Sequence, residues 1–119
     1  MKKFFLLIMM VVSTSVNATS NSEVDDYCLD FGMLMGALII TKANGEPIDL
    51  SAVVQRGKMI ANSYGTPNFQ SWAGNFSTTI IRKIAKMPYS EVHDIYNQNQ
   101  RDLVQLTASF KHVCRSQIN

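Results

Sequence analysis

After the first 18 residues, hydrophobic residues form one continuous run and then three stripes of helical spacing. The run, Gly32 to Ile40, holds nine consecutive non-polar residues. A helix that is apolar on nearly every face needs protein or lipid on every side, and nine residues are too few to cross a bilayer, which takes about 20. The run therefore predicts the central helix of a small bundle. We expect this helix to begin at Ser22, its N-cap, and to end at Asn44-Gly45.

Two glycines stand one helical turn apart in this run. Gly32 and Gly36 each cost about 1 kcal/mol relative to alanine in a helix interior. Their presence predicts that another backbone approaches the central helix closely along this side.

A second helix is expected from Leu50 to Tyr64, with Asp49 as its N-cap. Apolar residues recur along it at steps of three and four. The turn that follows contains Gly65 and leads into Thr66-Pro67, a cap-and-proline pair that favours the start of another helix.

The third helical segment ends at Met87-Pro88, and its middle has conflicting signals. Its apolar stripe keeps helical spacing throughout. Weak helix formers are placed together within it at Gly74, Asn75, Ser77, Thr78 and Thr79. We therefore expect either a kinked helix or a short helix followed by a longer one from Ser77 to Lys86.

The fourth helix is expected from Ser90 to Arg115. Steps of four and three place one seam along it, formed by Val92, Tyr96, Asn99, Leu103, Leu106, Phe110 and Val113. Such a seam packs against the first helix or forms a coiled coil with a second copy, and we favour the first. Asn99 lies within the seam, where a buried amide needs a hydrogen-bond partner.

The chain contains two cysteines, Cys28 near the start of the first helix and Cys114 near the end of the last. In an exported protein of this size they predict one disulfide, which requires the two helices to run antiparallel. The 86-residue separation corresponds to a stabilisation on the order of 4 kcal/mol through loop-closure entropy. No stretch alternates as a strand would. The expected fold is all-α: a small four-helix bundle, orthogonal or antiparallel, or a five-helix bundle if the third helix is broken.

The first 18 residues have the features of a cleaved signal peptide. Lys2 and Lys3 form a positive start, an apolar stretch follows, and Val16-Asn17-Ala18 provides a small-residue cleavage site. We expect cleavage after Ala18, which leaves residues 19–119 as a single helical domain. These features are typical of a bacterial exported protein, so the expected location is the periplasm, with secretion as the alternative.

Without the two signal-peptide lysines, nine basic residues face nine acidic ones. The mature net charge is therefore about zero and gives no argument for a nucleic-acid partner. Six acids lie between positions 19 and 50, whereas five bases and no acid lie between 51 and 90. This distribution favours charges placed at helix ends over a bipolar surface that steers a charged partner.

Residue types used in catalysis are present, but no motif brings them together. His93 and His112 would lie nearly 30 Å apart on one helix, so they cannot share a metal ion. Asp26 and Asp30 share a helix face, and paired carboxylates can do acid–base work, but at a helix start we expect them in water. No phosphate-binding loop, zinc-protease motif or nucleophile elbow is present. We expect no catalytic residue, no metal and no cofactor, and hence no enzyme.

Aromatic residues gather around the single tryptophan, Trp72. A core cluster is the default interpretation of such a group. The alternative is a recognition surface, because tryptophan concentrates binding energy at interfaces and basic residues follow directly. The partner-binding surface predicted on this basis consists of Phe69, Trp72, Asn75, Arg82, Lys83 and Lys86.

The layout resembles that of small helical periplasmic proteins with one disulfide, such as immunity proteins against cell-wall-cutting toxins and phage proteins that block lysozymes. The resemblance rests on the signal peptide, the mature length and the cysteines at the two ends of the domain, and it implies no particular site residues. We expect a periplasmic binding protein of inhibitor or immunity type, a monomer or homodimer, whose partner is an envelope enzyme or toxin. We expect no stable insertion into the membrane.

Two other functions stay open at this point. One is a carrier of a small ligand or lipid, with a methionine-rich interior of Met33, Met35, Met59 and Met87 as an adaptable pocket. The other is a hydrolase that acts on envelope material. An internal apolar cavity would favour the carrier, and a carboxylate or histidine cluster in a cleft would favour the hydrolase.

Overall fold

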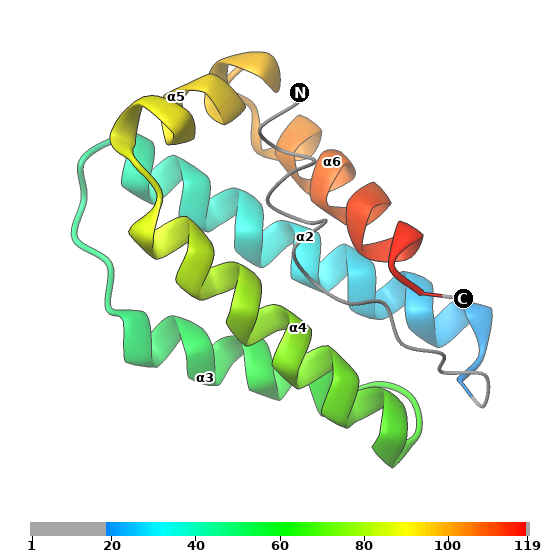
Figure 1. The fold of residues 1–119 in the computed structure, drawn as a ribbon. Coiled ribbons are helices and arrows are strands. Elements are labelled where there is room, and N and C mark those ends of the chain that lie inside the picture. Colours follow the sequence, from blue (N-terminus) through cyan, green and yellow to red (C-terminus); the bar gives the residue numbers. More distant parts are fainter. Residues whose placement is uncertain (1–18, 119) are drawn as a thin grey trace.

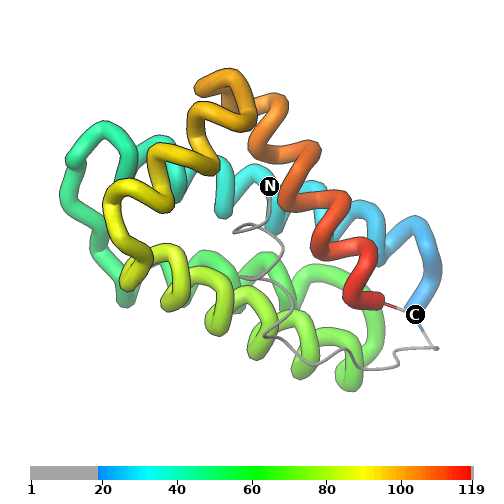
Figure 2. Tube along the Cα trace, turned by 45° about the horizontal axis from the view of Figure 1, so that its top comes forward, coloured from blue at the N-terminus to red at the C-terminus, as the bar shows by residue number. Residues whose placement is uncertain are grey.

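The computed structural model describes residues 19–118, and the predicted signal peptide lies outside them. The described residues form helices and no β-strand (Figure 1). Their bounds are α2 Asn21–Ala43, α3 Leu50–Ala61, α4 Pro67–Lys86, α5 Tyr89–Gln98 and α6 Leu103–Ser116. The predicted all-α fold is confirmed. As predicted, α2 is the central helix, because each of the other four packs against it (Figures 1 and 2).

The N-cap of helix α2 lies two residues before the expected one. The Ser20 hydroxyl, rather than that of Ser22, accepts the backbone N–H of Glu23 at 3.2 Å. Ser20 and Glu23 have the spacing of a capping box, which the sequence already contained. The far end is as predicted, at Asn44 followed by Gly45 with φ +73°. Helix α3 begins after Asp49 as predicted and ends at Ala61, three residues short of Tyr64.

The glycine side of α2 lies directly against α6. A Cβ placed on Gly32 would be 2.5 Å from the carbonyl oxygen of Thr107, and one placed on Gly36 would be 3.2 Å from the Cβ of Leu106. The predicted close approach is confirmed, and the neighbouring backbone is that of α6. The paired residues run in opposite directions along the two helices, so α2 and α6 are antiparallel, as expected.

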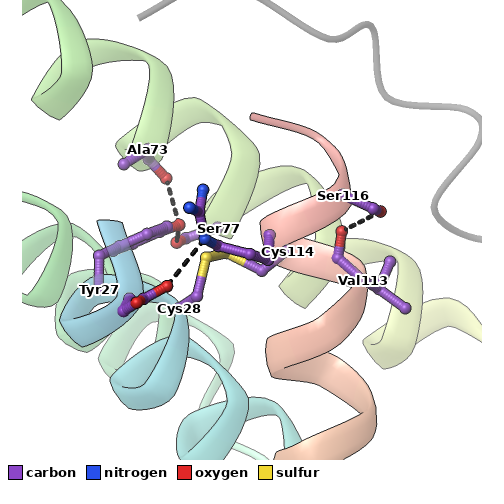
Figure 3. The surroundings of a disulfide bond; sticks show 9 residues. Tyr27, Cys28, Ala73, Ser77, Val113, Cys114 and Ser116 are labelled. Carbon is purple, nitrogen blue, oxygen red and sulfur yellow. Dashed lines mark hydrogen bonds and ion pairs between the residues drawn. A yellow bond between two sulfur atoms is a disulfide. The ribbon is translucent and has the colours of Figure 1, made fainter. Parts of the chain in front are cut away.

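The disulfide joins the same two helices. Cys28 of α2 and Cys114 of α6 are bonded, with their Cα atoms 5.6 Å apart (Figure 3). Beside the bond, the Tyr27 hydroxyl donates to the carbonyl of Ala73 at 3.1 Å and lies 2.6 Å from the Ser77 hydroxyl (Figure 3). Burial raises the pKa of Tyr27 well above its ordinary value. The neutral tyrosine thus ties α2 to α4 where the disulfide ties it to α6.

Helix α4 is a single helix of 20 residues, so the second of the two expected forms, a short helix followed by a longer one, is wrong. Packing explains its continuity, because Phe76 and Ser77 are buried in the middle of the run of weak helix formers. Tertiary burial outweighs the small propensity differences between residues. At its end, the Lys42 ammonium of α2 donates to the carbonyls of Ile84 and Ala85 at 2.9 and 2.6 Å.

The fourth predicted helix is two helices, α5 and α6. Gln100 and Arg101 adopt left-handed backbone conformations, with φ of 59° and 54°, and Asp102 caps α6. Asn99 is buried at the break, where its amide donates to the Ile95 carbonyl and accepts from the Ser109 hydroxyl. Beyond it, Leu106, Phe110 and Val113 of the seam are buried inside the molecule, as favoured, whereas Leu103 is 41% exposed. The five-helix form therefore arises from a break in the fourth predicted helix and not in the third.

Within the described part of the chain, no helix combines the length and the hydropathy that a membrane crossing needs.

Candidate functional site

One face of α2 is left uncovered by the other helices. Met33, in the middle of the apolar run, is 50% exposed, and Leu29 and Ala37, one turn to either side, are also exposed. Helix α6 borders this stripe with Leu103 and Val104, the latter 71% exposed. We call this surface the open face; it consists of Leu29, Met33 and Ala37 of α2, Ile60 of α3, and Leu103, Val104 and Ala108 of α6.

Two shallow hollows flank the stripe. The hollow toward α6 has a volume of about 410 Å³ and is almost wholly apolar, with Lys111 at its rim. The hollow toward α3 has a volume of about 420 Å³ and includes Asp30 and Arg56. Met33 and Leu103 line both hollows. The open face is therefore one continuous apolar groove with Met33 at its centre.

A third, smaller hollow of about 170 Å³ continues along α2 toward Thr41 and Val53. Leu34 and Ala37 belong both to this hollow and to the one that contains Arg56. The groove thus follows α2 beyond its centre, between α2 and α3.

Charged groups stand at the rim of the open face. The Asp30 carboxylate accepts a hydrogen bond from the Tyr64 hydroxyl at 2.5 Å. This bond and the charge of Asp30 raise the pKa of Tyr64 above its ordinary value. Arg56 and Lys111 form no ion pair with any residue in the range 19–118. The groove therefore has an apolar floor, one carboxylate and two cations available to a partner.

At the open face, helix α2 is not covered by other parts of the described chain. The run predicts protein or lipid on every side of α2, yet Leu29, Met33 and Ala37 meet solvent in the described structure. Contiguous exposed apolar surface rimmed by polar groups is typical of an interaction site. The open face is thus the strongest candidate for a functional surface.

Part of the partner-binding surface predicted around Trp72 is buried. Phe69 is fully buried and Trp72 is only 8% exposed, with its ring stacked on that of Phe76 at 4.9 Å. The two aromatic residues belong to the core, which was the default interpretation, and are not accessible to a partner. Of the remaining members, Asn75, Arg82 and Lys86 are exposed and Lys83 is half-buried. A binding role for these four polar residues stays a prediction.

The four methionines of the carrier hypothesis do not gather in one place. Met35 and Met87 are buried, whereas Met33 and Met59 lie on the surface, the latter 66% exposed on α3. Met59 does not line any of the three hollows described above. It therefore offers a matched control for Met33, with the same side chain outside the groove.

Across residues 19–118, no three histidine, cysteine or acidic side chains lie close enough together to hold a metal ion. His93 packs against the ring of Tyr89 at 4.4 Å, and His112 is exposed. No protein-family model, curated protein or solved structure matches the chain. The geometry of the open face is therefore the basis for a functional proposal.

Sequence reasoning did not single out the open face, although two signals pointed toward it. One is the apolar run, which needs cover on every side of its helix. The other is the pair Leu103 and Val104, which are adjacent on a helix, so only one of them can face α2.

Proposed function

We propose that this protein is an exported binding protein, of inhibitor or immunity type, that acts by binding another protein chain through the open face. The observation that carries the proposal is the uncovered apolar stripe Leu29, Met33 and Ala37 on the central helix. The disulfide supports an oxidising compartment, in agreement with the expected export. The expected targets are an envelope enzyme or a toxin.

The form of the groove favours a protein element as its ligand. Leu29 and Ala37 are eight positions apart, or about 12 Å along the helix axis, and the stripe keeps the i, i+4 spacing that an amphipathic helix can match. An apolar centre with charged residues at its rim is the usual composition of a protein interface. Arg56 and Lys111 would then orient the partner more than they would hold it.

The walls of the groove are held in place before any partner arrives. The backbone contact at Gly32 and the disulfide Cys28–Cys114 fix α6 against α2. A surface that is ordered in the free protein loses less conformational entropy on binding. Rigidity of this kind suits an inhibitor, whose use depends on tight association.

Affinity capture from an envelope extract tests the proposal when three forms of the protein are compared. The wild type and Met59→Asp should retain the same partner, and Met33→Asp should lose it. With the identified partner in purified form, Met33→Asp should raise the Kd at least about tenfold, which corresponds to 1.4 kcal/mol. If Met33→Asp binds as tightly as Met59→Asp, the open face is not the binding surface.

A further inference from the structure

We infer that, in the absence of a target, the open face is covered by the open face of a second copy of this chain. The two copies are related by a two-fold axis that passes near Met33, perpendicular to α2 and parallel to the face. The inference rests on the proposed function, because both use the same surface. It adds that the free protein occludes its own binding site by self-association, so that a target must compete with the second copy.

The order of residues along the groove follows from the contacts of α3. Tyr64 binds Asp30, and Gly57 lies against the side chain of Leu34. As α2 advances, α3 therefore runs backward, and the two helices are antiparallel. Arg56, the residue before Gly57, therefore lies beyond Met33 along α2, whereas Asp30 precedes Met33, and both charges line the same hollow. Both charges lie on the α3 side of the stripe, one on each side of its centre.

A two-fold axis at Met33 exchanges these positions. It places Asp30 of each copy opposite Arg56 of the other and so forms two equivalent ion pairs. Arg56 has no ion-pair partner within residues 19–118, and Asp30 has a second carboxylate oxygen beyond the one that Tyr64 occupies. Asp30 of α2 and Arg56 of α3 thus form a self-complementary pair of charges, which is the requirement for an isologous interface.

The apolar stripe satisfies the same symmetry. Leu29 and Ala37 lie at equal distances before and after Met33, so the axis sets the larger side chain of each copy against the smaller one of the other. Met33 meets its own equivalent at the axis, where a flexible thioether adapts to its neighbour. Figure 1 shows α6 beside α2, and the axis sets the α6 helices of the two copies opposite one another.

The interface is small and centred on one face of α2 from each copy, so we expect a micromolar or weaker Kd. Sedimentation velocity of the purified, disulfide-bonded protein, from micromolar to millimolar concentration, should show a monomer that converts to a dimer. Met33→Asp should remain monomeric throughout the range, while Met59→Asp should follow the wild type. A monomeric wild type at all concentrations would overturn the inference, as would dimerisation of Met33→Asp equal to that of Met59→Asp.

Charge reversal tests the arrangement of the two copies. Asp30→Arg alone sets two Arg–Arg pairs across the axis, and Arg56→Asp alone sets two Asp–Asp pairs, so each variant should dimerise at least about tenfold more weakly. An equimolar mixture should recover the dimer, because both pairs of the mixed dimer are then of opposite sign. Circular dichroism should first show that each variant is folded. Failure of the mixture of two folded variants to associate would overturn the two-fold arrangement.

The outcomes separate this inference from the proposed function. If the wild type is monomeric and Met33→Asp still loses the captured partner, self-association is wrong and the binding function stands. If the dimer forms as described but no partner depends on Met33, the inference stands and the proposed function falls. If the wild type is monomeric and cosediments with phosphatidylglycerol vesicles through Met33, the open face binds lipid, and both ideas are wrong.

Discussion

Two sides of helix α2 come from one apolar run and have opposite surroundings. On the α6 side, a Cβ on Gly32 would collide with the Thr107 carbonyl at 2.5 Å. On the open side, Met33, the next residue in the chain, is half exposed. Hydropathy alone does not distinguish the two sides. The distinction lies in residue size, because glycine allows a backbone of the same chain to approach, and a long flexible side chain leaves room for a different neighbour.

The disulfide lies on the α6 side of α2, which we call the closed side. Its removal should have the largest effect on stability. Replacing Cys28 and Cys114 by alanine should lower the free energy of unfolding by about 4 kcal/mol, because the denatured chain is no longer constrained across 86 residues. Denaturant unfolding measures the change. A variant as stable as the wild type would mean that α6 is held on α2 by packing alone.

The glycine contact should give the next largest effect. Gly32→Ala should cost about 2–3 kcal/mol, because the new methyl group would collide with backbone atoms that cannot move aside. Gly74→Ala in α4 is the matched control, since the nearest atom to its Cβ would be 4.0 Å away. The control should be neutral or stabilising by up to about 1 kcal/mol. Equal effects of the two substitutions would refute the closed side as described.

On the open side, a much more drastic change should leave stability almost untouched. Met33→Asp should alter the free energy of unfolding of the monomer by no more than about 0.5 kcal/mol, as at other exposed sites. Thermal unfolding at low protein concentration, with Met59→Asp as control, checks this expectation. A loss of several kcal/mol in Met33→Asp alone would place Met33 in the core.

The smallest expected effect is on the hydrogen bond between Tyr64 and Asp30, at the rim of the open face. The raised pKa of Tyr64 means that its contribution to stability is complete below pH 10, the ordinary tyrosine value, and is lost as pH rises through the higher folded-state pKa. Asp30→Asn should bring the Tyr64 pKa back toward 10. Absorbance titration of the phenolates, read as the difference from a Tyr64→Phe control, measures the shift. An unchanged pKa would show that Asp30 does not act on Tyr64.

Much of the architecture was predictable because the relevant signals are local. The Gly32 to Ile40 run gave the central helix, and the positions of Cys28 and Cys114 gave the antiparallel pairing with the last helix. Asp49 and Thr66 were correctly expected as caps, since side chains of these types bind free N–H groups at helix starts.

The errors occurred where long-range packing or an unmarked backbone turn decided the outcome. Ser77 weakens helix propensity locally, yet its hydrogen bond to Tyr27, 50 residues away, keeps α4 continuous. The break after Asn99 uses left-handed Gln100 and Arg101 without a glycine to mark it. The spacing of Asp102 and Gln105 resembles a capping box, but the regular seam across this region suggested a single helix.

The open face could not be assigned from sequence for a different reason. An apolar run indicates that a helix is covered, but it does not indicate which chain covers it. Leu29 and Met33 have the same hydrophobic character as the buried Phe31 and Met35. Only the placement of α3 and α6 shows which of these residues the domain leaves without a neighbour.

The central claim is that a protein chain covers the open face, a second copy of this one in the purified protein. Methyl NMR of wild-type protein labelled at methionine tests it most directly, in a dilution series without substitutions. The Met33 methyl signal should shift as the protein concentration rises, while the signal of Met59, which is also exposed to solvent but lies outside the groove, should stay in place. A Met33 signal that does not move up to millimolar concentration, or that moves no more than that of Met59, would contradict the account.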